Sequence, residues 1–497
     1  MSSATSSPWL SRTANAALSD QLAARLALQI DQGLLAPGSR LPSIRACAQH
    51  HGVSPSTVVT AYDKLQAQGL AQAFPQRGFF VRESAGHLAA GSRPEQAPAG
   101  PLPRRPLPIS ATTLMRGMFQ APGQQPMPGL GTLPIEWLDL PMLSQALKKV
   151  CNATGLAELT LQYGEPAGDL RLRRALALLL GERGVTTVPE QLVTTVGATH
   201  ALDVVTRSLL RAGDTVLVDE PGWSVEFARL RALGMRPLAV PRLDDGPDLE
   251  VMGQLIEAQP AEHRPRLYVT VSVLHNPTGG SISLQKAHRL LQFAQQHSLF
   301  ILEDDSYAHL APPHLPRLAA LDALERTILV GGFSKILAPS FRVGFIAAPK
   351  SLVDRFVDTK LLSTLSSPAL TEQALASCLE SGRLRRHAER IRQKLDAARA
   401  RSVQLAEAHN CRFAAPPRGL FGWLDVGCDT ERLALRMHDD GWLLAPGSLF
   451  FATPRPGSLM RINFATTQQQ RFWQALVAAR RELAGQTASN VGGSART

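Results

Sequence analysis

The sequence predicts a multidomain protein of 497 residues, with a small N-terminal α+β domain, a linker and a large α/β domain. Three observations support this. Short amphipathic helices and a hairpin pattern occupy the first 83 residues, a proline-rich stretch follows, and strand and helix patterns alternate beyond it. Such alternation is typical of a mostly parallel sheet covered by helices, and we expect a smaller α+β subdomain near the C-terminus.

The domain limits follow from shifts in composition. Ser84 to Pro108 is rich in Pro, Gly, Ala and Ser, so it buries too little apolar surface to fold by itself. We assign 14–83 to the first domain, 84–110 to a linker, 111–487 to the large domain and 488–497 to a disordered tail.

Composition narrows the class of protein. The five cysteines are scattered without a CxxC pair, which argues against a disulfide framework and a zinc site. No apolar run is long enough to span a bilayer and no signal peptide is evident, so we expect a cytoplasmic protein without bound metal. The net charge of +11 and the pI near 9.9 permit a polyanionic partner. The arginine-rich helix pattern at 383–401 is read as a solvated face.

The N-terminal domain begins with two expected helices, one from Asp20 to Gln32 and one that follows Pro42 and runs through Ile44 to about His51. A third follows, with Ser54 as its N-cap and Pro55 at its first position. Its apolar residues recur at helical spacing and should face the core: Val58, Ala61, Tyr62 and Leu65. The opposite face is then small, polar and weakly cationic, as a helix that enters the major groove of DNA requires.

Leu70 to Val81 reads as two short strands around a turn that carries Arg77, which makes a wing. Together with Leu41-Pro-Ser-Ile-Arg45 and Gly52-Val-Ser-Pro-Ser-Thr-Val58, this segment resembles the winged helix-turn-helix of GntR-type bacterial regulators. The resemblance and the polar face together suggest these contacts to double-stranded operator DNA: Arg45, Ser54, Ser56, Thr57, Thr60, Lys64 and Arg77.

The large domain contains a lysine at the end of a strand pattern. Thr327 to Val330 reads as a buried strand, a Gly-Gly pair interrupts it, and Lys335 follows in a Ser-Lys context. Desolvation disfavours an ammonium ion, so a lysine in a dry site supplies a neutral amine that can attack an aldehyde. Most lysines at such positions are ordinary surface residues, so the other residues decide.

Other chemistry-bearing residues also follow strand patterns. In an open parallel sheet the carboxyl ends of the strands form the binding edge, so we expect these side chains to converge there. They comprise small residues at a helix start, an aromatic ring, an amide, an acid with a phenol, and a hydroxyl with a fixed cation: Gly197, Ala198, Thr199, Trp223, Asn276, Asp304, Tyr307, Ser334 and Arg342.

One ligand fits the whole set. A pyridine aldehyde phosphate needs a lysine, an acid at its ring nitrogen, donors for its phenolate, a stacking ring and a phosphate cup. The set resembles the fold-type I aminotransferases, with a likeness from about Pro128 to Leu483. This likeness implies pyridoxal 5'-phosphate as cofactor, Tyr163 reaching the phosphate of the other subunit, and Arg461 binding a substrate carboxylate. Gly332 and Val196 depart from the hydroxyl residues that many relatives have there.

The order of these parts resembles that of the MocR-type regulators. The resemblance implies a homodimeric transcription regulator, with a head-to-tail, domain-swapped arrangement as one option, that senses an amine, an amino acid or a vitamin B6 species. An active aminotransferase with an accessory DNA-binding domain remains the alternative, because every residue that transamination needs is present. A cofactor-free structural dimer is a third reading.

Overall fold

The computed structural model describes residues 17–31, 34–36, 38–74, 77–82, 110, 112, 116–117, 127–152 and 163–493, with side chains described as far as 485. The expected linker lies outside these residues apart from Ser110. The chain divides into a smaller unit, made of Met1–Pro122 and Leu435–Trp442, and a larger unit, made of Gly123–Ala434 and Leu443–Thr497. Each is described by itself.

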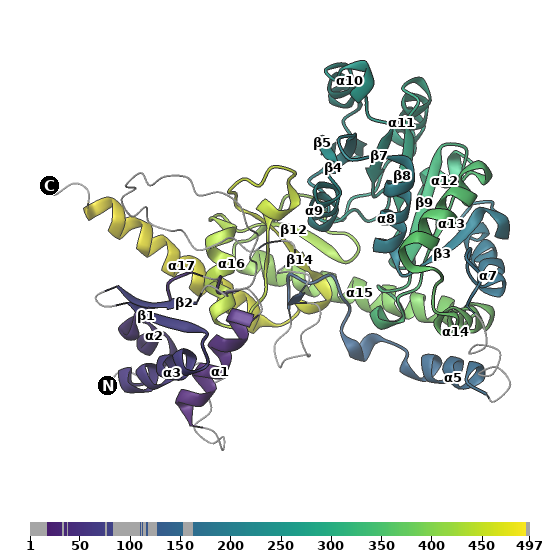
Figure 1. Cartoon of the computed structure of the whole chain (residues 1–497). Coiled ribbons are helices and arrows are strands. Elements are labelled where there is room, and N and C mark those ends of the chain that lie inside the picture. The colour runs from purple at the N-terminus through teal and green to yellow at the C-terminus, as the bar shows by residue number, and fades with distance from the viewer. Residues whose placement is uncertain are drawn as a thin grey trace, which may run out of the picture. The chain divides into compact units, whose positions relative to one another are not determined.

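Within the described residues of 17–82, the smaller unit forms three helices and a two-stranded hairpin (Figure 1). Its elements are α1 (Leu18–Asp31), α2 (Ile44–His51), α3 (Pro55–Ala67), β1 (Ala71–Phe74) and β2 (Gly78–Val81). Ser54 is the N-cap of α3, because its hydroxyl accepts a hydrogen bond from the Thr57 amide at 3.1 Å. Gly52, which ends α2, has a φ of 62°, a conformation that glycine adopts without strain. The predicted helix-turn-helix and wing are confirmed.

The core of the smaller unit forms beneath α3. Val58, Ala61, Tyr62 and Leu65 are each 0% exposed, which confirms the predicted apolar face. The hydroxyl of Tyr62 donates a hydrogen bond to the Pro42 carbonyl at 2.8 Å, so this buried polar group is satisfied. Helix α3 thereby buries one face and leaves the hydroxyl-bearing face accessible.

The larger unit is built on an eight-stranded sheet with the order β3-β10-β9-β8-β7-β4-β5-β6. The five strands from β9 to β5 run parallel, whereas β10 is antiparallel to both of its neighbours. The strands are β3 (Leu192–Thr195), β4 (Thr215–Glu220), β5 (Arg236–Leu243), β6 (Gly246–Pro247), β7 (Leu267–Thr270), β8 (Phe300–Asp304), β9 (Thr327–Gly332) and β10 (Gly344–Ala347). The predicted, mostly parallel sheet is confirmed.

Each face of the sheet packs against its own layer of helices (Figure 1). Successive strand residues alternate between the two cores: Val216 and Val218 belong to one, and Leu217 belongs to the other. The first core includes α8 (Ala198–Leu209), α9 (Ser224–Ala232) and α13 (Lys350–Thr364), and the second includes α10 (Leu249–Glu257), α11 (Leu284–Gln296) and α12 (Leu318–Leu321). Burial on both faces explains the continuous apolar runs of the strands.

The C-terminal part of the chain contains a four-stranded antiparallel sheet of order β11-β12-β14-β13, which is the predicted α+β subdomain. In the described part of the chain, six further helices lie before, between or after the strands of the two sheets. The helices are α5 (Leu140–Val150), α7 (Leu170–Gly181), α14 (Ala369–Glu380), α15 (Arg383–Ala408), α16 (Thr430–Asp439) and α17 (Gln470–Gly493). The strands are β11 (Arg412–Phe413), β12 (Phe421–Asp425), β13 (Ala445–Pro446) and β14 (Leu459–Asn463). Helix α17 runs into the segment expected to be a disordered tail, because no proline interrupts 482–493.

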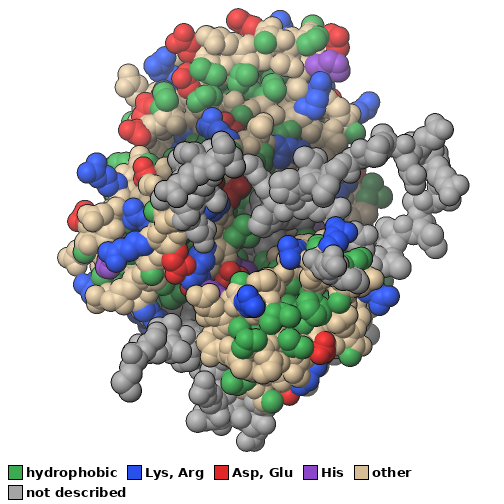
Figure 2. Space-filling view, turned by 90° about the vertical axis from the view of Figure 1, so that its left-hand side faces the viewer, with side chains coloured by type: hydrophobic (Ala, Val, Ile, Leu, Met, Phe, Trp, Pro, Cys, Tyr) green, Lys and Arg blue, Asp and Glu red, His purple; other side chains and the backbone are tan. Residues whose placement is uncertain are grey.

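The basic residues on one face of the molecule are mixed with other side chains. On the face that Figure 2 shows, Lys and Arg side chains are spread among acidic and hydrophobic ones. On α15, Arg390 pairs with Asp139 at 2.8 Å and Arg399 pairs with Asp396 at 2.7 Å, as expected for a solvated helix face. Among the described residues, no helix is long and apolar enough to cross a bilayer.

Two glycines beside α7 provide a test of the packing. Gly168 has a φ of 101°, and a Cβ there would lie 1.8 Å from Thr194 Oγ1, whereas a Cβ on Gly181 would meet nothing within 4 Å. We expect Gly168→Ala to destabilise the larger unit by about 2 to 4 kcal/mol, because overpacking and backbone strain both contribute. Gly181→Ala is the matched control and should be neutral or slightly stabilising. Urea unfolding followed by circular dichroism measures both, and equal midpoints for the two variants would contradict the packing described.

Candidate functional site: a lysine at the carboxyl edge of the sheet

Three candidate residues meet where neighbouring parallel strands end. Asp304 is the last residue of β8 and pairs in register with Val330 of β9, and Lys335 lies just beyond β9. Asn276 lies in the loop that follows β7, the other neighbour of β8. The shared strand direction therefore brings together residues that are far apart in the sequence.

Lys335 lies in a desolvated, cationic environment. Burial, followed by repulsion from Arg461 and Arg342, lowers its pKa to about 8, although Asp304 acts in the opposite direction. A Cβ on Gly131 would lie 3.6 Å from the Lys335 Nζ, so the glycine leaves the amine an open approach. A fraction of the Lys335 amine is therefore neutral and nucleophilic near neutral pH.

Asp304 is a buried carboxyl group whose environment favours the neutral form. Burial raises its pKa to about 6, although hydrogen bonds from the backbone and side chain of Ser306 lower it; Glu226 and Asp305 raise it further. A cationic partner placed against this group would stabilise its charged form and lower its pKa again. The protonated nitrogen of a pyridine ring is such a partner.

Asn276 connects the acid side of the site to Arg461. Its amide nitrogen lies 3.4 Å from the Tyr307 hydroxyl, and its carbonyl oxygen accepts a hydrogen bond from Arg461 Nη1 at 2.9 Å. Burial raises the pKa of Tyr307 above its usual range, so this phenol keeps its proton and can donate it in a hydrogen bond. Asn276 and Tyr307 thus form a pair of donors beside Lys335.

The residues predicted to form a phosphate cup lie together at the N-terminus of α8. Arg342 Nη1 donates to Ser334 Oγ at 3.3 Å, and Arg342 Nη2 donates to the Val196 carbonyl at 3.1 Å. Gly197 has a φ of 80°, and a Cβ there would lie 2.6 Å from Arg342 Nη2. Any side chain larger than that of glycine at position 197 would collide with this guanidinium. Glycine therefore leaves room for the guanidinium beside the backbone amides of Ala198 and Thr199, which begin α8 and are free to bind an anion. The cup thereby combines a fixed cation with amide donors.

Trp223, which follows β4, lies near Asp304 at the carboxyl edge of the sheet. It lines a small cavity, of about 30 Å³, together with Asp304 and Val271. An aromatic face beside the acid suits a flat heteroaromatic ring.

Arg461 is the predicted carboxylate ligand, and it is buried. Its guanidinium lies 4.4 Å from the centre of the Phe421 ring and 5.1 Å from that of Phe450, and its Nη2 donates to the Gly129 carbonyl. Its Nε is buried and has no partner among the described residues. Burial lowers the pKa of Arg461 to about 10. A buried cation with an unused donor is suited to bind an anion.

These residues fit pyridoxal 5'-phosphate by the chemistry of their donors. The amine, the acid, the phenol and amide pair, the aromatic ring and the cup beside Gly197 are all present in one region. The structure therefore brings together ten of the predicted residues: Gly197, Ala198, Thr199, Trp223, Asn276, Asp304, Tyr307, Ser334, Lys335 and Arg342. Arg461 contacts them through Asn276.

Tyr163 is not brought into this site within its own chain. Its side chain is 85% exposed, in the loop that precedes α7. The proposed role in the other subunit needs such exposure, and it stays a prediction.

The candidate DNA contacts on α3 form a local hydrogen-bond network. Ser54 Oγ lies 2.7 Å from Ser56 Oγ and 2.8 Å from Thr57 Oγ1, and Thr60 donates to the Ser56 carbonyl at 3.0 Å. Lys64 differs from the expectation, since its ammonium pairs with Asp20 of α1 and is partly neutralised there. It is the weakest candidate of the set.

The two arginines of this set are exposed. Arg45 lies in the first turn of α2, and Arg77 lies at the hairpin turn, where its guanidinium packs 5.8 Å from the Phe74 ring centre and 5.7 Å from that of Phe80. Arg40 was missed: a Cβ on Gly78 would lie 3.3 Å from its guanidinium. Only the bridge between Arg40 and Phe80, a tertiary contact, places it beside the wing.

Sequence reasoning also missed residues around Lys335 and Arg461. Gly131 lies against Lys335, and Phe421 lies against Arg461. Asn463 holds the segment around Gly131 in place, because its side-chain amide donates to the Leu130 and Thr132 carbonyls at 2.9 and 2.8 Å. The only available signal was the Gly129-Leu-Gly131 sequence, which resembles any glycine-rich loop.

Comparison with known proteins agrees with both halves of this description. Residues 137–478 match the aminotransferase class I and II family, and residues 18–81 match the gntR family of bacterial regulatory proteins. An uncharacterized HTH-type transcriptional regulator of Escherichia coli, YjiR, is 28% identical over 473 residues, which cover 92% of this chain and 96% of that protein.

Relatives that match a smaller part of this chain bear aminotransferase names. The 2-aminoadipate transaminase of Thermus thermophilus is 30% identical over 352 residues, which cover 69% of this chain and 86% of that protein. The crystal structure of LysN, an alpha-aminoadipate aminotransferase of Thermus thermophilus complexed with N-(5'-phosphopyridoxyl)-L-leucine, has a TM-score of 0.65 and 26% identity and covers 72% of this chain and 92% of that one. The family implies pyridoxal 5'-phosphate as cofactor. The chain therefore belongs to the aminotransferase class I and II family and carries an N-terminal domain of the gntR family of bacterial regulatory proteins.

Proposed function

We propose that the protein is a DNA-binding transcription regulator that uses pyridoxal 5'-phosphate to sense an amino acid, an amine or a vitamin B6 species in the cytoplasm. The observation that carries this proposal is that one chain holds both a helix-turn-helix with an exposed hydroxyl face and a lysine with a pKa near 8 beside a phosphate cup. Relatives that share both halves bear the name of HTH-type regulators.

Each residue around Lys335 has its own role in the proposed sensing of a ligand. The cofactor, when bound, supplies an aldehyde and an electron-withdrawing ring. Lys335 would hold the aldehyde, Asp304 would keep a proton at the ring nitrogen, and Arg342 would anchor the phosphate. Arg461 offers its unused Nε to the carboxylate of an incoming amino acid. An amine that competes with Lys335 for the aldehyde then changes the state of the site.

A homodimer would complete the site. Tyr163, Leu362 and Leu365 are 85%, 92% and 54% exposed. Together they expose more apolar surface than single scattered residues usually do, which is typical of an interface. Burial against a second copy would cover it, and the Tyr163 hydroxyl of one subunit would then reach the phosphate of its partner. A head-to-tail, domain-swapped pairing is one arrangement of such a dimer.

The alternative function is a working aminotransferase with an accessory DNA-binding domain. The resemblance to a 2-aminoadipate transaminase and the presence of Lys335, Asp304 and Arg461 favour it. Titration with amino acids, followed by the visible spectrum, by release of a keto acid and by DNA binding, separates the two functions. A spectral change with altered DNA binding and no turnover supports the regulator, whereas multiple turnovers without an effect on DNA support the enzyme.

Covalent cofactor binding provides the first test of this proposal. We expect borohydride to fix pyridoxal 5'-phosphate to Lys335, and we expect uptake by cofactor-free protein to quicken as pH rises through about 8. The reason is that the pKa of Lys335 is lowered from 10.5 to about 8, so the reactive neutral amine predominates only above that pH. Stopped-flow absorbance and peptide mapping measure the rate and the labelled residue.

Lys360 is the matched control for this labelling. It is 0% exposed and burial lowers its pKa to about 8 as well, but it lies on α13, where it hydrogen-bonds to Thr194. Cofactor recovered on Lys360, or equally on both lysines, would contradict the assignment.

The DNA-binding face is tested by salt dependence. We expect Arg45→Ala and Arg77→Ala each to weaken binding to a random-sequence duplex and to reduce the slope of log K against log salt by about one, because each removes one phosphate contact. Lys64→Ala should change the slope less, since Asp20 already pairs with this ammonium. Fluorescence anisotropy at several salt concentrations gives the slopes, and three unchanged slopes would remove this face from the proposal.

The role of Arg461 is tested with pairs of ligands that differ by one carboxylate. We expect Arg461→Ala to weaken an amino acid by about 2 to 4 kcal/mol, the scale of losing one partner of a buried charge pair, and to spare the corresponding amine. The exposed Arg455 is the control, because its guanidinium packs on Phe451 instead. Calorimetry measures both ligands, and an equal loss for the amine would mean that Arg461 supports the fold and does not bind the carboxylate.

A further inference from the structure

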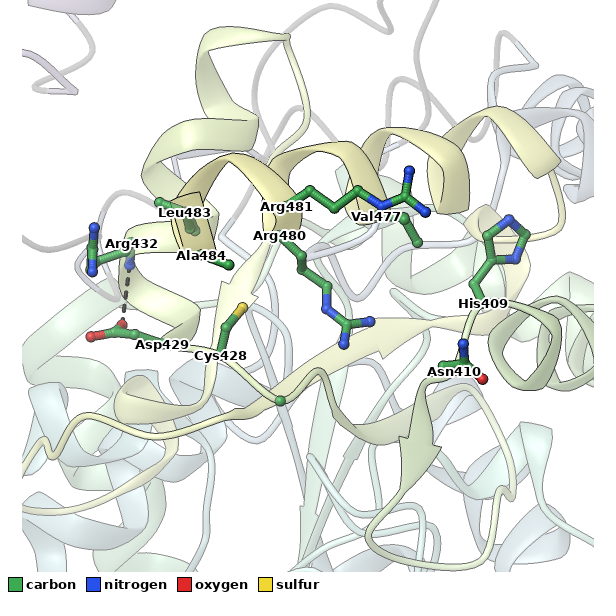
Figure 3. A pocket seen from close by; sticks show the side chains of 11 residues that line it. His409, Asn410, Cys428, Asp429, Arg432, Val477, Arg480, Arg481, Leu483 and Ala484 are labelled. Atoms are coloured by element: carbon green, nitrogen blue, oxygen red, sulfur yellow. Dashed lines mark hydrogen bonds between the residues drawn. The ribbon is translucent and has the colours of Figure 1, made fainter. Parts of the chain in front are cut away.

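Two hollows outside the lysine site are lined by arginines. One, of about 570 Å³, lies in the C-terminal part of the larger unit (Figure 3). Figure 3 shows that Arg480 reaches into it, while Arg432 and His409 lie at opposite ends. Arg432 and Arg481 are exposed to solvent, so water already stabilises their charges. This hollow does not require a ligand.

The second hollow has a volume of about 720 Å³, and we call it the Arg183 pocket. It lies among α7, α14, α15 and the short helix η4 (Ala308–Leu310). Its lining includes four arginines: Arg183, Arg317, Arg385 and Arg392. Apolar residues, among them Leu179, Pro313 and Ala388, form much of the rest.

Arg183 lacks a carboxylate partner among the described residues. Its Nη2 donates to Nδ1 of His309 at 2.8 Å, and His309 is 6% exposed. Burial and the neighbouring guanidiniums hold the pKa of His309 well below its usual range, so the ring is neutral. Burial also lowers the pKa of Arg183 to about 10. The partly buried guanidinium of Arg183 therefore has the neutral imidazole of His309 as its hydrogen-bond partner.

Glu182 lines the pocket and is exposed to solvent; it acts on Arg183 only at a distance, since the described residues form no ion pair between the two, and the other acidic side chains nearby pair with other arginines. Glu380 accepts from Arg171 Nε at 2.7 Å, and Glu389 pairs with Arg392 within α15. At the floor, Asp305 pairs with Arg317 at 2.8 Å, yet Arg317 Nη2 is buried without a partner in the described part of the chain. Of the four arginines, Arg317 and Arg392 pair with Asp305 and Glu389, which leaves Arg183 and Arg385 against the exposed Glu182, so the pocket keeps an excess of positive charge.

An unneutralised cation near the interior is costly, because burial removes hydration that nothing replaces. A bound anion offsets this cost, and a guanidinium matches the paired oxygens of a carboxylate or phosphate. We propose that the Arg183 pocket binds a small organic anion, with a carboxylate or phosphate head group on Arg183 and an apolar body against Leu179, Pro313 and Ala388. This site lies outside the lysine site and does not depend on the proposed function.

Calorimetry with phenyl phosphate, benzoate and neutral benzyl alcohol tests the site. The protein is first loaded with pyridoxal 5'-phosphate and then freed of excess cofactor, so that the phosphate cup beside Arg342 is filled while the Arg183 pocket stays open. We expect one molecule of either anion per chain and no binding of the alcohol. Arg183→Gln should weaken the anions about tenfold, as the loss of one hydrogen bond to a charged group predicts.

Further variants separate binding from folding. Arg183→Lys keeps the charge and should retain part of the affinity, and Arg385→Gln removes a more exposed charge of the same pocket and should weaken the anions a few-fold. Arg174→Gln, an exposed position on α7 outside the lining, is the matched control and should bind as the unaltered protein does. Absent binding of both anions, or equal affinities in Arg183→Gln, Arg385→Gln and the control, would overturn the proposal.

Discussion

The burial of charge at the carboxyl edge of the sheet is the constraint on which the site depends. Water that would stabilise the ions is excluded, so the pKa of Asp304 rises to about 6 and that of Lys335 falls to about 8. Both groups therefore change their charge at a pH close to neutral. A cofactor that carries a cationic ring nitrogen, an aldehyde and an anionic phosphate compensates each of these costs at once, which explains why the residues are useful only as a set.

The double burial of the parallel strands fixes where that edge lies. Because Leu217 faces one helix layer while Val216 and Val218 face the other, a shift of one residue in register would place each side chain in the wrong core. The register of β8 against β9 is therefore held firmly, and with it the placement of Asp304 beside the strand that leads to Lys335. Packing far from the chemistry sets the geometry of the site.

Much of the fold was predictable because its signals are local. The N-cap at Ser54, the apolar spacing of α3 and the strand before Lys335 each depend on a few neighbouring residues, and the structure confirms all three. The convergence of Asn276 and Asp304 followed from a general property of parallel sheets. What could not be predicted depends on pairs distant in sequence: Lys64 with Asp20, Arg461 against Phe421, and Arg183 on His309. No periodicity or spacing connects such residues, so only the folded chain shows which charges are neutralised.

The segment Asp304–Leu310 relates the two sites of the larger unit. Within it Asp304 and Tyr307 face the lysine site, whereas Asp305 pairs with Arg317 and His309 accepts from Arg183 at the other pocket. Successive residues of one short stretch therefore belong to different environments. An anion on Arg183 would weaken the hydrogen bond to His309, and any resulting movement of η4 passes directly to Tyr307, its N-cap residue. Coupling in this sense requires only that the anion bind one arrangement of the segment better than another, since differential affinity is what shifts an equilibrium.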